Sequence, residues 1–436
     1  MKPKYLSTYT ERRCNDSLFQ SANWPSTIGE AIITIPAYNE SWETMESVLD
    51  SLVIGCHLHK ADILIFINYK ANDSNSIKEN SKHLYSQIEA YIENDNSDLQ
   101  FHLFIKELTS KKAGVGLARK LLMDCAFLRF QHTNNDGIII CLDADTHVKP
   151  YYLSQVIATF NSNNMIDAWS IDFAHPTEAL HGEEKKAILF YELHLRYFVG
   201  MQRHINLPYA FQTIGSAMAV RAYAYAKQGG MPVRQAGEDF YFLHKYAKDW
   251  KLGDLSTTTV LPSARVSERV PFGTGRAVLE YINGDEMRGK SYNPESFMLL
   301  NDLMKEFEHM VYNNISRSTH NIRSNVLLSF FEGIDYKSMI DSICTTTMDK
   351  IGRVKKLYAW FDAFKLMKYL HFMRDSGYPN LSISKCLKYY QHVRNISDFE
   401  TEQQQLEFLR KEYRNIDYNN QWRADLISRL SSTSAS

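Results

Sequence analysis

Two aspartates, Asp143 and Asp145, come directly after the apolar run 138–142, which reads IIICL. Two carboxylates about 5 Å apart repel each other by about 3 kcal/mol at an effective dielectric constant of roughly 20. A hard divalent cation turns this repulsion into attraction, and oxygen ligands favour Mg²⁺ or Mn²⁺ over zinc. Because such ions complete their coordination shell with phosphate oxygens, the pair predicts a metal site shared with a phosphorylated substrate.

The pair can also be explained without a metal, as a solvated turn in which Asp145 caps the following helix. For two aspartates spaced in this way elsewhere in a chain, this is the usual explanation. The fully apolar run before them favours the metal site here. His147 is either a further ligand or an exposed loop histidine, and the second explanation is the simpler one.

Short apolar runs alternate with amphipathic stretches over the first 150 residues. We expect strands at 31–35, 63–67, 101–105 and 138–142, and helices at 43–52, 76–92 and 116–130. Runs rich in β-branched residues that alternate with helices predict a parallel sheet covered on both faces. In such sheets ligands bind beyond the carboxyl ends of the strands. The polar residues at these ends are Asn39, Glu40, Asn68, Lys111, Lys112, Asp143 and Asp145.

The pattern changes twice further along the chain. Residues 151–289 mix expected strands, at 167–173 and 215–220, with helices and polar loops. After about residue 290, apolar residues recur at helical spacing and Gly and Pro become sparse. We therefore expect an N-terminal arm (1–28), two halves of an α/β domain (29–150 and 151–289) and a C-terminal all-helical appendage (290–436). We expect the final residues, 431–436, to be disordered.

Composition excludes some classes of partner and location. The chain has 436 residues with 49 Lys+Arg against 50 Asp+Glu, so nothing in the charge favours nucleic acid. None of the six cysteines forms a C-x-x-C pair, which predicts free, buried thiols in a reducing compartment. Residues 1–30 lack the apolar core of a signal peptide, and no apolar run has membrane-spanning length. We expect a cytoplasmic protein.

The motifs at the strand ends resemble those of glycosyltransferase family 2, whose inverting members have the GT-A fold. The resemblance covers about residues 30–280, and its elements occur in the family's order. It implies a GT-A-like mixed, mainly parallel sheet flanked by helices. The matching segments are IPAYNE at 35–40, KAGVGLAR at 112–119, LDAD at 142–145, GSAMAVR at 215–221 with GGM at 229–231, and AGEDF at 236–240.

This resemblance implies a nucleoside-diphosphate sugar as donor. Ala37, Tyr38 and Glu40 would contact its nucleoside. Lys112 and Arg119 would lie near the base, the ribose or the diphosphate. Residues 29–150 would then be the half of the domain that binds the nucleotide sugar, and 151–289 the acceptor and catalytic half.

The resemblance also assigns the chemistry. Asp143 and Asp145 would hold Mn²⁺ or Mg²⁺, which stabilises the departing diphosphate as a Lewis acid. Asp239 would be the general base that takes the acceptor proton, and Glu238 would position the acceptor or support that base. Both acids precede an expected helix at 240–250, so capping of its N-terminus is the alternative role, and it is compatible with catalysis.

Three positions depart from the family's pattern. The family usually ends its second strand in two aspartates that read the base, whereas Asn68 follows Ile67 here. An amide can donate and accept hydrogen bonds, so we expect Asn68 to face a base whose identity stays open. Lys120 stands where an asparagine commonly follows A-R. A downstream metal-binding histidine, present in some relatives, cannot be assigned.

Residues 265–276, RVSERVPFGTGR, combine three arginines with glycines. Arginine forks match phosphate oxygens, so the segment is typical of a loop that closes over a diphosphate. A surface hairpin with solvated charges explains it equally well.

Residues 350–374 are basic and rich in aromatic side chains, a composition typical of a helix that lies on an anionic membrane. However, Leu357, Trp360, Phe361 and Phe364 are more simply explained as a core face with lysines on the wet side. We therefore expect core packing, with peripheral contact at the inner face of the membrane as the weaker alternative.

The resemblance thus implies a metal-dependent hexosyltransferase of polysaccharide biosynthesis that acts with inversion on a glycan or lipid-linked acceptor. One alternative is a sugar-phosphate nucleotidyltransferase, but that class places a glycine-rich basic loop where PAYNE stands here. The other is a non-catalytic scaffold that binds sugar nucleotides. The presence of Asp143, Asp145 and Asp239 together argues against a scaffold.

Overall fold

The structure is a computed structural model, and it describes residues 3–109, 113–234, 237–265, 273–284, 289–315 and 324–415, together with 418, 421, 422, 424–426 and 428. The chain divides into two compact units. Unit 1 comprises residues 1–179, 213–246 and 251–276, and unit 2 comprises 180–212, 247–250 and 277–436.

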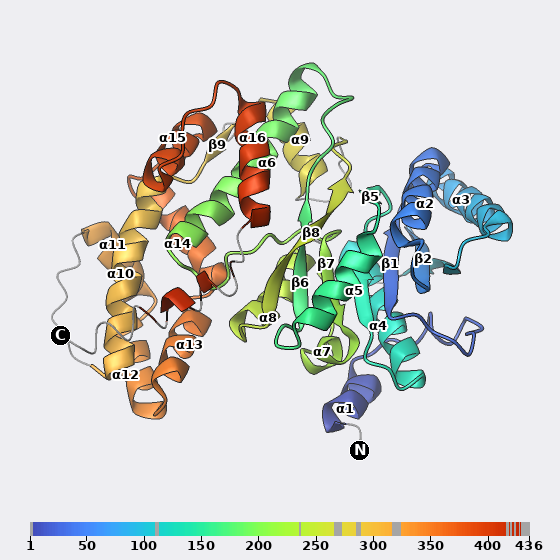
Figure 1. Cartoon of the computed structure of the whole chain (residues 1–436), viewed down its shortest axis with the longest axis horizontal. Helices are drawn as coiled ribbons and strands as arrows, with labels where there is room; N and C mark the ends of the chain where they lie inside the picture. The colour runs from blue at the N-terminus through green and yellow to red at the C-terminus, as the bar shows by residue number, and fades with distance from the viewer. Residues whose placement is uncertain are drawn as a thin grey trace. The chain divides into compact units, whose positions relative to one another are not determined.

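Within its described residues, unit 1 holds an eight-stranded sheet of order β3-β2-β1-β4-β7-β6-β8-β5 (Figure 1). β2, β1 and β4 pair in parallel, as do β2 with β3 and β6 with β8, whereas β7 and β5 run antiparallel to their neighbours. The strands are β1 (Ala31–Ala37), β2 (Ala61–Lys70), β3 (Gln100–Leu108), β4 (Ile138–Cys141), β5 (Thr146–Val148), β6 (Ala168–Phe173), β7 (Met218–Arg221) and β8 (Leu252–Pro262).

Apolar sequence explains the central strands, since every residue of β1 and β4 is buried. Helices of unit 1 cover this sheet, and α4 packs against β1, β2 and β4. The helices are α1 (Lys4–Arg12), α2 (Trp42–Cys56), α3 (Asn75–Asn94), α4 (Val115–His132), α5 (Tyr152–Ser162) and α7 (Ala222–Lys227), while α8 (Glu238–Lys248) and α9 (Thr274–Ile282) begin in unit 1 and end in unit 2. The expected fold class, a mixed and mainly parallel α/β sheet flanked by helices with a helical C-terminal part, is confirmed.

Helix α4 is buried almost all round, and it carries charged side chains that bind other parts of unit 1. Arg129 is 1% exposed, and its Nε donates to Asp62 Oδ2 on β2 at 3.2 Å. The guanidinium also donates to the carbonyl oxygen of Thr27 at 2.6 Å. Because a buried charge is tolerated only when it is paired and hydrogen-bonded, these contacts fix where α4 lies on the sheet.

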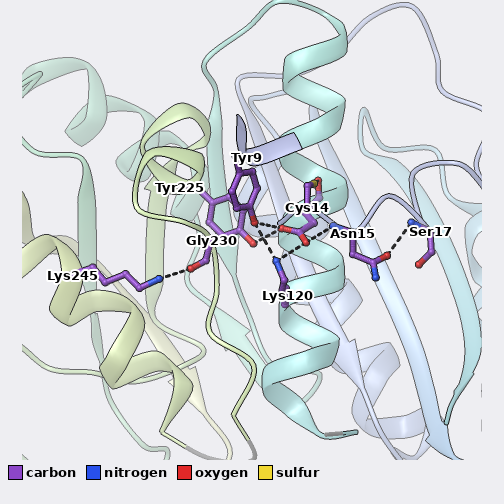
Figure 2. Close-up of polar contacts among 9 residues, drawn as sticks. Tyr9, Cys14, Asn15, Ser17, Lys120, Tyr225, Gly230 and Lys245 are labelled. Atoms are coloured by element: carbon purple, nitrogen blue, oxygen red, sulfur yellow. Dashed lines mark hydrogen bonds and ion pairs between the residues drawn. The ribbon is translucent and has the colours of Figure 1, made fainter. Parts of the chain in front are cut away.

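The N-terminal arm is attached to the same helix at Asp124, which is completely buried. Figure 2 shows Tyr9 and Asn15 of the arm near Lys120 of α4. Tyr9 and Tyr225 donate their hydroxyl protons to Asp124 Oδ1 at 2.5 and 2.7 Å. The backbone N–H of Asn15 and the ammonium of Lys120 both donate to Oδ2 at 2.8 Å. Four donors therefore stabilise one carboxylate, and two of them come from the arm.

Exchange of Asp124 for leucine is expected to lower the free energy of unfolding by about 3 kcal/mol or more, because the Lys120 ammonium loses its buried partner. Tyr9→Phe removes a single hydrogen bond and should cost about 1 kcal/mol. Urea unfolding followed by circular dichroism measures both. Equal losses in the two variants would contradict the central role given to the carboxylate.

Unit 2 is helical apart from a two-stranded antiparallel pair, among the residues described there. Its α6 contacts α10, α15, α16 and β9, and Glu192 on α6 pairs with Arg196 and Arg410 at 2.8 and 2.7 Å. The elements are α6 (Gly182–His204), β9 (Lys290–Ser291), α10 (Pro294–Asn313), α11 (Asn325–Gly333), α12 (Tyr336–Thr346), α13 (Lys350–Trp360), α14 (Ala363–Asp375), β10 (Leu381–Ser382), α15 (Ile383–Arg394) and α16 (Glu402–Asn415).

The basic, aromatic segment 350–374 forms two helices, α13 and α14. Leu357 and Phe361 are completely buried and Trp360 is half-buried, as core packing requires, whereas Phe364 is 40% exposed. Over the described part of the chain, no helix is both long enough and apolar enough to cross a bilayer. All six cysteines are free thiols, and all but Cys14 are buried, as expected.

Candidate active site

Asp143 and Asp145 lie in the short turn between β4 and β5. The backbone N–H of Thr146 donates to the carbonyl oxygen of Asp143 at 3.0 Å, which closes the turn. β5 then pairs antiparallel with β8, and Thr146 lies opposite Pro262. The turn therefore lies next to the end of β8, so that residues just beyond Pro262 can reach Asp145.

A buried arginine joins this turn to the start of α8. Arg119, in the first turns of α4, donates from Nη2 to Asp143 Oδ1 and from Nη1 to Glu238 Oε1. Its burial alone would lower the pKa of the guanidinium, but Asp143 and Glu238 raise it, so Arg119 stays charged. A Cβ atom at Gly215 would lie 2.8 Å from both terminal nitrogens of Arg119, which explains why a glycine stands there.

The two acids at the start of α8 have different surroundings. The helix begins at Glu238, two residues earlier than expected, so that both acids lie in its first turn. Glu238 is 3% exposed and paired with Arg119, whereas Asp239 is half-buried. Desolvation and the neighbouring Glu238 raise the pKa of Asp239 to about 7, although Arg119 and the N–H of Phe240 oppose the shift. Adjacent acids with different environments are typical of a site in which one is structural and the other exchanges a proton.

Arg265, just beyond β8, has a role that the sequence did not reveal. Its Nη2 donates to both carboxylate oxygens of Glu40, at 2.8 and 2.7 Å, and lies 2.8 Å from Asp145 Oδ2. Burial tends to lower the pKa of Arg265, but Asp145 and Glu40 raise it overall. The first arginine of the 265–276 segment thus lies on the acidic site instead of in solvent, while Arg269 falls outside the described residues.

The residues expected at the donor nucleoside lie where β1 and β2 end. Ala37 closes β1 and is buried, and its carbonyl oxygen accepts a hydrogen bond from Asn68 Nδ2 at 3.0 Å. Asn68 is 4% exposed, so this amide nitrogen ties the two strand ends together. Lys112 lies outside the described residues.

Asp73 is a further residue of this region that the sequence reasoning missed. It accepts a hydrogen bond from the Tyr38 hydroxyl at 3.0 Å, and its other oxygen accepts the N–H of Lys70 at 2.7 Å. It thus holds the tyrosine ring against the loop that follows β2. A lone aspartate in a polar loop gives no sequence signal of such a role.

The side chains of the turn fit Mn²⁺ or Mg²⁺ by chemistry, since Asp143 and Asp145 are 37% and 23% exposed and offer only oxygen. Among the described residues, no group of three or more His, Cys, Asp and Glu side chains could hold a metal by itself. The Nε2 atom of His147 lies 2.7 Å from Ser47 Oγ on α2. Water and phosphate oxygens would therefore have to complete the shell.

The arginines change the electrostatic argument made from the sequence. Arg119 pairs with Asp143 and Arg265 pairs with Asp145, so the chain itself offsets part of the repulsion between the two carboxylates, although each arginine also serves a second acid. Repulsion alone therefore does not require a metal. The case for a metal depends on the accessible oxygen donors of the turn.

No family model matches the sequence, and no characterised protein matches it. By structure, the chain is similar to residues 1–349 of TarS from S. aureus, with 12% identity over 77% of this chain and 91% of that one and a TM-score of 0.35. It covers 55% of the longer TarS structure, with a TM-score of 0.34.

The mannosyltransferase PcManGT from Pyrobaculum calidifontis, solved with GDP-Man and Mn²⁺, is similar over 94% of this chain and 92% of that one, with 10% identity and a TM-score of 0.35. At TM-scores this low, these likenesses carry no inference about residues or activity.

Proposed function

We propose that this protein is a metal-dependent, inverting glycosyltransferase that moves a sugar from a nucleoside-diphosphate sugar to an acceptor hydroxyl. The observation that supports the proposal best is the bridge through Arg119. This bridge brings the Asp143 turn to Glu238, and Glu238 is adjacent to Asp239, whose pKa is raised. In this proposal the Asp143 turn binds the diphosphate and Asp239 is the base for the hydroxyl, and both belong to unit 1.

In the proposed reaction Asp239 accepts the proton of the acceptor hydroxyl as the oxygen attacks the anomeric carbon of the donor. A base whose pKa lies near the working pH combines a useful population of carboxylate with a favourable proton transfer. Glu238, held by Arg119, keeps the first turn of α8 in place. A divalent ion on Asp143 and Asp145 would stabilise the charge of the departing diphosphate.

The remaining assignments belong to the same proposal. Ala37, Tyr38, Glu40 and Asn68 would surround the nucleoside, with Lys112 near the base, the ribose or the diphosphate. Membership of glycosyltransferase family 2, a hexose as the transferred sugar and a glycan or lipid-linked acceptor follow from the resemblance of motifs. The boundaries at 28, 150 and 289 and the cytoplasmic location stay predictions.

A product-release assay tests the proposal. A panel of nucleoside-diphosphate sugars is incubated with Mn²⁺ and acceptors, and free nucleoside diphosphate is measured, with Asp239→Asn as the matched control. Release that depends on Asp239 supports a glycosyltransferase. Pyrophosphate as the product would indicate a nucleotidyltransferase, and binding of every donor without turnover would indicate a scaffold.

Asp145→Asn is expected to weaken Mn²⁺-dependent binding of a nucleoside diphosphate by at least about tenfold, because the amide supplies a poorer ligand to a hard cation. Calorimetric titration with and without Mn²⁺ measures the effect. Glu43→Gln, on the exposed first turn of α2, is the control and should bind normally. Unchanged metal-dependent binding in Asp145→Asn would remove this residue from the site.

A further inference from the structure

The contacts of Arg265 resemble the surroundings of a bound cation. A single nitrogen, Nη2, lies within hydrogen-bond distance of three carboxylate oxygens, two from Glu40 and one from Asp145, at 2.7–2.8 Å. Glu40 follows β1 and Asp145 follows β4, and these strands are neighbours in the sheet. One positive group therefore links two strand ends through their acids.

The two arginines of the site differ in how readily they can leave. The Arg119 side chain on α4 is 3% exposed, and its departure would leave Glu238 buried without its cation. The Arg265 side chain is 32% exposed and stands in the loop after β8, where its backbone N–H donates to Ser263 Oγ at 3.3 Å. Rotation of the long Arg265 side chain would free Asp145 and also Glu40, whose side chain is 7% exposed, so the arriving cation has to replace Arg265 at both acids.

We propose that Arg265 is an exchangeable counter-ion that occupies the acidic site until a divalent cation and a nucleoside diphosphate arrive together. The inference rests on the proposed function, and it adds a regulatory role for this residue. With Arg265 in place, the site attracts a metal ion less strongly, because the arginine cancels one of its negative charges and already pairs with Asp145. A diphosphate offers the guanidinium fork an alternative pair of oxygens, so its arrival releases the aspartate to the metal.

This exchange makes binding of the metal and of the diphosphate cooperative. When the metal binds alone, the displaced Arg265 guanidinium loses its carboxylate partners and gains no other anion. When a diphosphate binds as well, the displaced guanidinium pairs with the phosphate oxygens. Each ligand thereby raises the affinity for the other, and by thermodynamic linkage the two enhancements are equal. Free metal is bound weakly by the unliganded protein.

The test measures Mn²⁺ binding directly, by the electron paramagnetic resonance signal of free Mn²⁺, with the full chain and without any turnover. Arg265→Met is expected to bind Mn²⁺ alone at least about tenfold more tightly than the wild type, because the competing cation is gone. Arg265→Lys keeps a positive charge and should stay close to the wild type. The double variant Arg265→Met/Asp145→Asn should lose the gained affinity, which locates it at this site.

A second titration adds UDP or GDP. In the wild type the diphosphate is expected to raise Mn²⁺ affinity at least about tenfold, and in Arg265→Met this enhancement should shrink to about threefold or less. Equal Mn²⁺ affinity of wild type and Arg265→Met, together with equal enhancement by the diphosphate, would overturn the inference and leave the proposed function standing. Absence of Mn²⁺ binding in every variant, with or without either diphosphate, would overturn the proposed function and the inference with it. Thermal melting of each variant shows that it is folded.

Discussion

Replacement of Asp239 by asparagine is expected to lower the rate of sugar transfer by about 10³-fold or more, while the affinity for donor and metal changes by less than about twofold. An amide of the same shape cannot accept the acceptor proton, and general-base catalysis contributes about 10²–10⁴-fold. Initial rates with a working donor give the first quantity and calorimetry gives the second. An Asp239→Asn enzyme with normal transfer would refute the role given to this residue.

The same residue sets a pH dependence whose direction follows from its raised pKa. The base acts when it is ionised, so the wild-type rate should rise with pH and level off above about 7, whereas the residual rate of Asp239→Asn should lack this step. Since the folded pKa lies above the unfolded one, ionisation of Asp239 opposes folding above about pH 4, increasingly so up to about 7. Asp239→Asn should therefore melt higher than the wild type at pH 8 and equally at pH 4.

Removal of the Arg119 guanidinium is expected to give the largest loss of stability in unit 1. Arg119→Met leaves Glu238 buried without a cation and leaves the charge of Asp143 without its arginine partner. Removal of one partner from a buried ion pair costs about 3–5 kcal/mol. Activity should be lost as well, because the first turn of α8 is no longer held beside the turn after β4. Urea unfolding and the release assay measure the two effects.

The double variant Arg119→Met/Glu238→Gln shows whether the loss of stability in Arg119→Met arises from the buried charge of Glu238, which no longer has a cationic partner. If it does, the second change restores part of the stability lost in the first, although activity stays low. Losses that simply add would mean that the two side chains stabilise the fold independently.

The strands at the centre of the sheet could be predicted because each is a buried run with apolar residues on both faces. The expected strand at 31–35 lies within β1, and the expected strand at 138–142 extends one residue beyond β4. Asp143 and Asp145 therefore follow a strand, as predicted. Helix α8 was also found, but it starts at Glu238. The local pattern of apolar residues was enough to predict a strand or helix wherever burial alone determines where it forms.

The partners of the charged residues could not be predicted, because each depends on a tertiary approach. Arg265 reaches Asp145 only because β5 pairs antiparallel with β8, and no local pattern specifies that pairing. Arg119 was expected beside the donor, whereas its guanidinium is engaged by two acids of the protein. Helix α6, at 182–204, packs with the C-terminal helices in unit 2, another tertiary contact that no local pattern specifies.

Three charged side chains of helix α4 each bind a different region of unit 1. Arg119 binds the turn after β4, Asp124 binds the N-terminal arm and Arg129 binds β2. Directed evolution toward other sugar nucleotides should therefore leave this helix unaltered, because a single change there disturbs distant parts together. Library diversity belongs in the loops that follow β1 and β2, where Tyr38 and Asp73 meet, with Glu40 kept unchanged because it binds Arg265.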